Sequence, residues 1–307
     1  MKDYKSILSA CSLSKKFGDI LAVDNISFDI YKGEIFGFLG PNGAGKTTTI
    51  KMMSGILEPD SGSVTIHSED HGRSTGICPQ HLVVWENLTC LEQVLYMGRM
   101  YNIRSQEVHK RADELLGSLE LTGVKERLAK NLSGGMQRRL NIALALIHSP
   151  EIVFLDEPQA GLDPQSRILV RDYIRSIKNR TTVVLTTHDM EEAEKLSDRI
   201  CIIDKGKLLV TGSADEILNA NGEEDLVEID FVSDVRNEFL PYSGDELISG
   251  ITVAGNKMSF KTRNPQSSLE NILKVIRERG LEVKGLHLRK KSLEDIFIGL
   301  TGRSIRE

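Results

Sequence analysis

One stretch of the chain has the composition of a phosphate-binding loop. From Gly40 to Thr47 it matches G-x-x-x-x-G-K-[ST], in which glycines let backbone N–H groups converge on phosphate oxygens. Lys46 can reach the β- and γ-phosphates, and the Thr47 hydroxyl suits Mg²⁺, which prefers oxygen ligands. We therefore expect ATP and Mg²⁺ to bind here. The predicted nucleotide-binding residues of this loop are Gly40, Pro41, Asn42, Gly43, Ala44, Gly45, Lys46, Thr47 and Thr48.

Two adjacent carboxylates, Asp156 and Glu157, supply the chemistry that complements this loop. They follow the apolar run 152–155, and parallel sheets present ligands at the carboxyl ends of their strands. We predict that Asp156 binds Mg²⁺ together with Thr47. Glu157 is then the general base for the attacking water, a role worth about 10²–10⁴-fold in rate. The combination predicts hydrolysis of a nucleoside triphosphate.

Strands and helices that alternate along the chain must position these residues. An apolar strand over 34–39 leads into the loop, and the loop opens a helix over 47–53. Further strands are expected at 152–155, 183–186, 199–203 and 207–210. The helix 165–178 is amphipathic, and we expect Ile168, Leu169, Tyr173 and Ile177 to face inward. This order predicts an α/β P-loop NTPase fold with a mostly parallel central sheet, preceded by an antiparallel β region.

Residues 81–150 are predicted to form an inserted helical subdomain. Thr89 and Glu92 form a capping-box pair, a third helix should run from Ser133 to His148, and a stripe of apolar residues marks the helix between them. The stripe contains Val108, Ala112, Leu115, Leu116 and Leu119. The apolar run 82–85 is compatible either with an exposed docking surface or with a buried strand or helix start.

A polar, turn-rich stretch over 219–224 indicates a domain boundary. We expect the ATPase domain at 1–219 and a small α+β C-terminal domain at 220–307, with strands 226–232, 251–253, 258–261 and 286–289 and helices over 268–279 and from 292. No uninterrupted apolar stretch reaches the roughly 18–20 residues of a membrane span. A membrane role would therefore require a partner.

Composition excludes several classes of protein. Hydrophobic residues make up 40 % and charged residues 27 % of the chain, which is typical of a folded globular protein. The net charge of −5 gives no basic footprint, so we expect no nucleic-acid partner. The cysteines are widely separated without metal-ligand spacing, which argues against a zinc or disulfide site. They are Cys11, Cys78, Cys90 and Cys201.

The segment from Asn131 to Arg139 reads NLSGGMQRR, and its LSGGMQ resembles the signature of the ABC ATPase family. Physically it is a helix N-terminus with a serine and two glycines, which is a second anion cradle far along the chain from the first. The resemblance implies that each ATP sits between the loop of one protomer and the signature of another, in a two-fold symmetric dimer. The expected contacts are Ser133, Gly134, Gly135 and Gln137.

Other family positions follow in order. The resemblance implies that Phe17 stacks on adenine, that Gln80 senses metal and water as a further Mg²⁺ ligand, and that Asp163 lies in the loop crossing the dimer interface. It also implies that His188 contacts the γ-phosphate. The chain has Gln159-Ala160 where relatives commonly have Thr-Ser, and we expect this to tune interface contacts without abolishing activity.

The C-terminal tail points to a class of transporter. Ser292 to Phe297, followed by Leu300 to Gly302, looks like the tail of exporter ATPases of the drug-resistance and Nod-factor type. Those work with a separately encoded permease. The resemblance therefore implies an ATPase subunit that dimerises with itself or a homologue, closes on ATP and drives export. It would be cytoplasmic and peripheral at the inner face of the cell membrane, held there by the permease.

Two other functions remain as alternatives: a soluble ABC ATPase that acts in translation or DNA repair, and an inactive nucleotide sensor. ABC ATPases of translation usually carry two cassettes, and those of DNA repair insert long coiled coils. This chain has one cassette and no long insertion. An inactive nucleotide sensor would not need the full set of Lys46, Asp156, Glu157 and His188.

Overall fold

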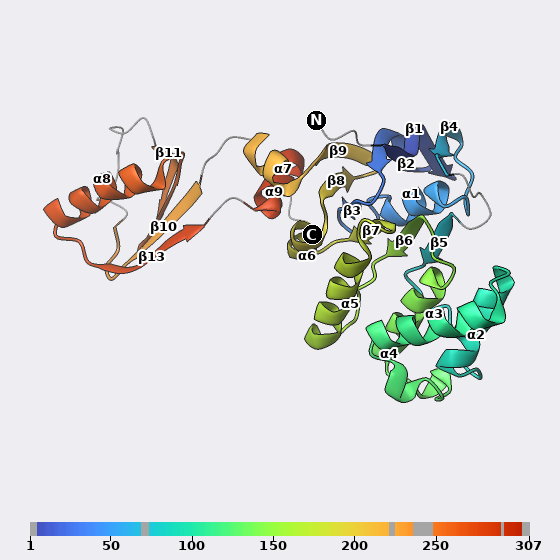
Figure 1. Ribbon diagram of the computed structural model, residues 1–307. Helices are drawn as coiled ribbons and strands as arrows, with labels where there is room; N and C mark the ends of the chain where they lie inside the picture. Colours follow the sequence, from blue (N-terminus) through green and yellow to red (C-terminus); the bar gives the residue numbers. More distant parts are fainter. Residues whose placement is uncertain (1–4, 69–73, 221–224, 236–247, 290–291, 303–307) are drawn as a thin grey trace. The chain divides into compact units, whose positions relative to one another are not determined.

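The computed structural model describes residues 5–68, 74–220, 225–235, 248–289 and 292–302. Two compact units make up the chain, one over Met1–Ala214 and the other over Asp215–Ser304 (Figure 1). The division falls between Ala214 and Asp215, slightly before the polar stretch at 219–224, of which residues 221–224 lie outside the described residues. We call the first unit the cassette and the second the C-terminal unit.

A six-stranded sheet forms the centre of the cassette, in the order β5-β6-β7-β3-β8-β9. All neighbouring strands run parallel except β8 and β9, so the expected mostly parallel sheet is confirmed. Every residue of β3, β6 and β7 is buried, as expected for strands covered on both faces. The strands are β3 (Ile35–Leu39), β5 (Thr75–Cys78), β6 (Ile152–Asp156), β7 (Thr182–Thr187), β8 (Arg199–Asp204) and β9 (Lys207–Gly212).

A second, antiparallel sheet of the cassette has the order β2-β1-β4. Its strands are β1 (Ser6–Phe17), β2 (Ile20–Tyr31) and β4 (Ser61–Ile66). The ring of Phe28 packs 5.8 Å from that of Phe36 and 5.2 Å from that of Phe38, which joins this sheet to the central one. The antiparallel region is therefore present as expected, although we had not predicted β1.

Helices surround the central sheet and form the inserted segment (Figure 1). The helix α5 corrects one expectation: Ile168 is 49 % exposed, and the buried face carries Val170, Tyr173, Ile174 and Ile177. These four residues have the i, i+3, i+4, i+7 spacing of one helical face, and this is the face that packs into the core. The helices are α1 (Lys46–Met53), α2 (Cys90–Met100), α3 (Ser105–Ser118), α4 (Gly134–Leu146), α5 (Pro164–Ile177) and α6 (Met190–Leu196).

The inserted segment follows the predicted pattern closely. The capping box of Thr89 and Glu92 is confirmed, and Val108, Ala112 and Leu116 are buried on α3. Residues 82–85 are neither strand nor helix, and three of the four side chains are exposed, so the alternative of a buried strand or helix start is wrong. Within the described residues, we find no helix with the length and hydropathy that would span a membrane.

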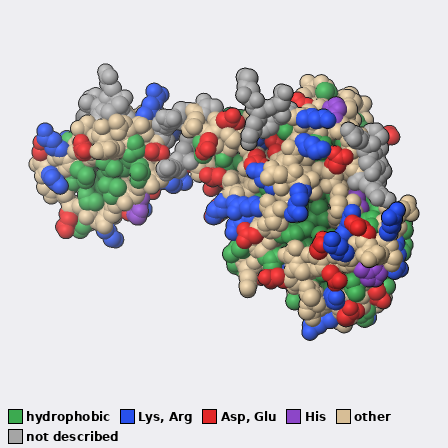
Figure 2. Space-filling model, in the orientation of Figure 1, with side chains coloured by type: hydrophobic (Ala, Val, Ile, Leu, Met, Phe, Trp, Pro, Cys, Tyr) green, Lys and Arg blue, Asp and Glu red, His purple; other side chains and the backbone are tan. Residues whose placement is uncertain are grey.

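The C-terminal unit holds a four-stranded antiparallel sheet in the order β11-β12-β10-β13. Its core joins Phe231 and Phe260 of the sheet to Ile272 and Ile276 of α8. On the side visible in Figure 2, apolar side chains gather at the middle of this unit with charged ones around them. Its elements are α7 (Ala214–Ala220), β10 (Asp225–Phe231), β11 (Ile248–Ala254), β12 (Lys257–Thr262), α8 (Pro265–Glu278), β13 (Val283–Arg289) and α9 (Leu293–Thr301).

Candidate nucleotide-binding and catalytic site

The loop between β3 and α1 requires glycine at two positions. Gly45 has φ of 107°, and a Cβ there would lie 2.4 Å from the carbonyl oxygen of Ala22. A Cβ on Gly40 would lie 2.2 Å from the carbonyl oxygen of Ile203. A side chain at either position would collide with the backbone of a neighbouring segment, so only glycine fits.

Lys46 is the buried cation of this loop. Its Nζ donates to the carbonyl oxygens of Gly40 at 2.7 Å and Pro41 at 2.9 Å. Burial lowers the pKa of the ammonium, while the negative charges of Glu157 and Asp156 act in the opposite direction. The lysine is thus held by weak neutral acceptors inside the loop, which phosphate oxygens can replace as stronger ones.

Asp156 lies at the carboxyl end of β6, where two hydroxyls hold its carboxylate. Oδ1 accepts from Thr186 Oγ1 at 2.6 Å and from Thr47 Oγ1 at 3.2 Å. The pairing of β6 with β7 places Thr186 directly beside Asp156. The proposed Mg²⁺ ligands Thr47 and Asp156 are therefore in contact, and their hydroxyl and carboxylate oxygens are donors that suit a hard cation.

Thr186 is a residue that sequence reasoning missed. Its Oγ1 accepts from the backbone N–H of Glu157 at 2.9 Å while it donates to Asp156, and its side chain is fully buried. One hydroxyl thus orients both predicted acidic residues. A threonine two residues before His188 could have drawn attention to it, but only the strand order shows that β7 lies beside β6.

The carboxylate of Glu157 is held between two predicted site residues from distant parts of the chain. Gln80 Nε2 donates to Oε2 at 3.2 Å, and His188 Nδ1 lies 3.2 Å from Oε1. The backbone of Glu157 has φ of 48°, which is uncommon for a residue other than glycine and concentrates at functional sites. The structure therefore joins Gln80, Glu157 and His188 into one cluster next to Asp156, and we call these four residues the acidic cluster.

The signature residues lie at the N-terminus of α4, and their contacts are local. Ser133 Oγ accepts from the backbone N–H of Met136 at 3.2 Å, and Gln137 Nε2 donates to the carbonyl oxygen of Ala129 at 2.9 Å. A Cβ on Gly135 would lie 3.2 Å from Ser166 Oγ. In the described part of the chain, no hydrogen bond joins these residues to the phosphate-binding loop.

Asp163 and Phe17 also stand outside the acidic cluster. Asp163 Oδ1 accepts from the backbone N–H of Ser166 at 3.0 Å, and this hydrogen bond lowers the pKa of the carboxyl. Phe17 is 50 % exposed at the end of β1, with Lys15 Nζ 5.9 Å from the centre of its ring. The half-exposed ring is accessible to solvent, as a stacking residue must be.

Comparison with known proteins places this site in a family. The family model described as "ABC transporter" matches residues 23–160. The linearmycin resistance ATP-binding protein of Bacillus subtilis (strain 168) is 34 % identical, over 98 % of this chain and 100 % of that protein. A Nod factor export ATP-binding protein I from Burkholderia lata is 37 % identical, over 96 % of this chain and 97 % of that protein.

A solved structure shows the same fold. It is described as the ATP-binding subunit of an ABC transporter, has a TM-score of 0.65 and 27 % identity, and is matched over 71 % of this chain and 94 % of that one. This chain belongs to the ABC transporter family. It is an ATP-binding subunit of such a transporter, and its ATPase activity is coupled to transport.

In this ABC ATPase the signature helix also supports the loop that carries Gln80. Arg138 of α4 is 7 % exposed and donates to the carbonyl oxygens of Pro79 at 3.0 Å and Gln80 at 2.5 Å. Asn141, one turn further along, accepts from the backbone N–H of Val83 at 3.3 Å. The helix that begins at the signature therefore holds the segment that positions Gln80 against Glu157.

The departure at Gln159-Ala160 lies beside the acidic cluster of the ABC ATPase. Gln159 is buried, and together with Ala160 it lines a small groove shared with Glu157 and His188. Glu192 lines the same groove and accepts from Thr187 Oγ1 at 3.2 Å. The two unusual residues therefore stand next to the residues expected to meet the γ-phosphate.

Proposed function

We propose that two copies of this chain close on two ATP molecules and thereby drive export through a separate membrane permease. Each ATP, with Mg²⁺ on Thr47, Gln80 and Asp156, would be held between the phosphate-binding loop of one copy and the signature of the other. Glu157 would accept a proton from the attacking water, and His188 would contact the γ-phosphate. Phe17 would stack on adenine.

One observation carries this proposal. The acidic cluster, Lys46 and the loop glycines meet at the carboxyl ends of the central strands. The signature instead begins α4 in the helical segment, which Figure 1 shows apart from α1. A single triphosphate cannot use two separated anion cradles of the same chain. Two-fold pairing of copies lets each cradle of one copy complete the site of the other.

The exposed run 82–85 supports a membrane protein as the further partner. Leu82, Val83 and Trp85 are 38 %, 48 % and 42 % exposed, and the Trp85 ring meets that of Tyr96 at 5.5 Å. Gln93, fully buried on α2, accepts from the N–H of Trp85 at 2.9 Å and donates to its carbonyl oxygen at 3.1 Å. The backbone N–H and carbonyl oxygen of Trp85 thus form hydrogen bonds within the protein, while the exposed apolar side chains remain available for docking.

The direction of transport follows from relatives. Two of them are named for resistance to linearmycin and daunorubicin and others for export of Nod factor. These names support export by this chain. The ABC transporter family supports its location at the inner face of the membrane, where a permease would hold it.

The shared site is tested in the hydrolysis-disabled variant Glu157→Gln. With ATP and Mg²⁺ it should form a dimer in sizing chromatography with light scattering. Adding Gly135→Asp should abolish the dimer while ATP binding persists, because it places a negative charge within the signature that the partner's triphosphate would have to approach. Adding Lys46→Ala should abolish both.

Two results would contradict the proposal. A Glu157→Gln protein that binds ATP but stays monomeric at high concentration removes the shared site. A Gly135→Asp double variant that dimerises normally removes the signature from it. Gly123→Asp, at a glycine with open space around it, is the matched control and should leave the dimer unchanged.

A further inference from the structure

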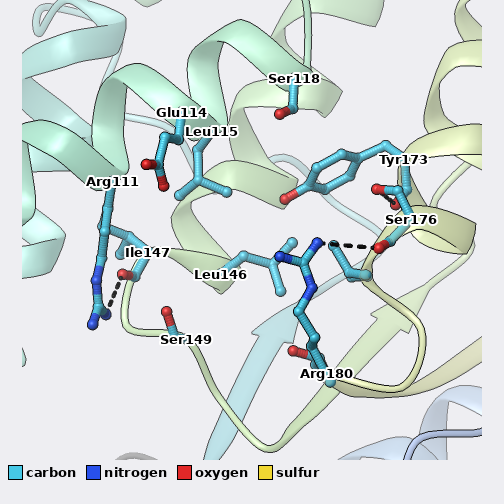
Figure 3. A pocket seen from close by; sticks show the side chains of 12 residues that line it. Arg111, Glu114, Leu115, Ser118, Leu146, Ile147, Ser149, Tyr173, Ser176 and Arg180 are labelled. Carbon is cyan, nitrogen blue, oxygen red and sulfur yellow. Dashed lines mark hydrogen bonds between the residues drawn. The ribbon is translucent and has the colours of Figure 1, made fainter.

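A groove lies in the cassette away from the acidic cluster, between α3 and the end of α4 on one side and α5 on the other. Its volume is about 300 Å³, within the usual range of small-molecule sites. Figure 3 shows side chains from all three helices and from the segment after α5 turned toward it. None of the predicted nucleotide-binding, catalytic or metal-binding residues lines it.

The groove has an apolar floor. Ile147 is fully buried, and Leu146 and Ile177 are less than a tenth exposed. Leu115 of α3, which packs partly against the same core, closes the other side. Such a floor takes the hydrocarbon part of a ligand out of water.

Tyr173 places an unused hydrogen-bonding group in this apolar setting. The residue is 8 % exposed, and Figure 3 shows its hydroxyl directed into the groove. Within the described residues, the hydroxyl has no hydrogen-bond partner. The hydroxyl opens onto the groove, so its acceptor is water or a ligand rather than a group of the described chain. Burial raises the pKa of Tyr173 to about 12, so the phenol keeps its proton and acts as a donor at neutral pH.

Arg180 supplies the charge next to this hydroxyl. Its Nη2 atom donates to the carbonyl oxygen of Ser176 at 3.2 Å. The rest of the guanidinium carries further N–H donors and faces the groove (Figure 3). In the described part of the chain no carboxylate pairs with Arg180. The guanidinium and the phenol therefore present two donor groups on one side of the groove.

The other charged side chains at the rim of the groove determine which ligand charge it favours. Arg111 is committed to Glu107, with Nε to Oε1 at 2.8 Å, and to the carbonyl oxygen of Ile147 at 3.3 Å. Glu114 lines the groove from α3 and has only a distant contact with Lys110 at 4.0 Å. One uncommitted cation and one nearby carboxylate favour a monoanion over a doubly charged phosphate.

We propose that this groove binds a small amphipathic carboxylate, with its two oxygens on Arg180 and the Tyr173 hydroxyl and its hydrocarbon part over Leu115, Leu146, Ile147 and Ile177. A carboxylate has two acceptor oxygens, which match the two donor groups, and a single charge. Bound there, it contacts α3 and α5 at once and bridges the helical segment to a helix that covers the sheet.

The experiment measures binding of octanoate to the full chain without nucleotide, by titration calorimetry, beside octanol and octylammonium. Octanoate should bind at least about tenfold more tightly than either, since only a carboxylate offers both donor groups a negatively charged acceptor. Arg180→Gln and Tyr173→Phe should each weaken octanoate about tenfold or more. Glu114→Gln should tighten it, because a repelling carboxylate is removed.

Matched controls lie outside the groove. Arg127→Gln and Tyr96→Phe, both at exposed positions, should leave octanoate affinity unchanged. The proposal fails if octanol binds as tightly as octanoate, if octanoate does not bind at millimolar concentration, or if Arg180→Gln has no effect. None of these readouts depends on ATP or on dimer formation, so the result is separate from that of the proposed function.

Discussion

The cassette and the C-terminal unit are both built from helices packed on sheets, but they differ in the polar side chains that they bury. In the cassette the buried polar set includes Lys46, Asp156 and Glu157, which meet at the edge of the central sheet. In the described part of the C-terminal unit it consists of Thr262 and Ser268, whose hydroxyls bond to each other at 2.6 Å. One unit buries charges and the other buries a neutral, mutually satisfied pair.

This difference distinguishes buried residues that serve binding or catalysis from buried residues that only stabilise the fold. Burying a charge is costly unless partners compensate, so a cluster of buried ions persists where a ligand or reaction uses it. The hydroxyl pair of Thr262 and Ser268 instead ties β12 to the first turn of α8. We therefore expect the same substitution to affect turnover in the cassette and only stability in the C-terminal unit.

The largest effect is expected for Glu157→Gln. Removing the proposed general base should lower kcat by about 10²–10⁴-fold, with ATP affinity retained. Steady-state phosphate release and nucleotide binding measure the two quantities. The control is Glu270→Gln on the exposed face of α8, which should leave both unchanged. Near-normal turnover by Glu157→Gln would remove the contrast between the two units.

A core truncation in the C-terminal unit comes next. Phe260→Ala should destabilise this unit by about 3–5 kcal/mol, because it removes a fully buried ring from the core, while kcat of the cassette persists. Denaturant unfolding and ATPase assays measure the two. Val232→Ala, at a side chain that is 60 % exposed, should change stability little. Parallel loss of ATPase with the unfolding of this unit would show that the two units are not separable.

A matched pair of threonines gives the sharpest comparison. Thr186→Val removes the hydrogen-bond donor to Asp156 and the acceptor for the Glu157 N–H. We expect the activation free energy of hydrolysis to rise by about 1–3 kcal/mol, which lowers kcat roughly 5- to 150-fold. Thr186→Ser keeps the hydroxyl and should restore most of the rate. Because the residue acts through the acidic pair, KM for ATP should change less than kcat.

Thr262→Val is the counterpart in the C-terminal unit and has the smallest expected effect. It breaks the hydrogen bond to Ser268 and should lower stability by about 1 kcal/mol, with kcat unchanged. Unfolding curves measure the first quantity and phosphate release the second. Equal loss of turnover in Thr186→Val and Thr262→Val would mean that both act through general destabilisation.

Local patterns were sufficient for much of the fold and of the candidate site. The loop 40–48, the carboxylates after an apolar strand and the capping box at Thr89 depend on neighbours within a few residues, so spacing alone identifies them. The inward face of α5 was partly wrong at Ile168, because it depends on which face of the helix the core covers. The strand β1 escaped notice because serines and lysines interrupt its apolar alternation, while pairing with both β2 and β4 holds it in place.

The motifs around Lys46, Asp156 and the signature are contiguous, and each depends on local backbone geometry, so the amino-acid sequence is enough to predict which residues carry the chemistry. Which of these residues touch one another depends on the packing of distant segments. Thr186 reaches Asp156 because β7 pairs with β6, and Arg138 supports Gln80 because α4 packs beside β5. Tyr173 and Arg180 are only seven residues apart, but Leu115 of α3 and Leu146 of α4 line the same groove through the tertiary fold. Long-range packing creates these contacts, and no spacing in the chain encodes them.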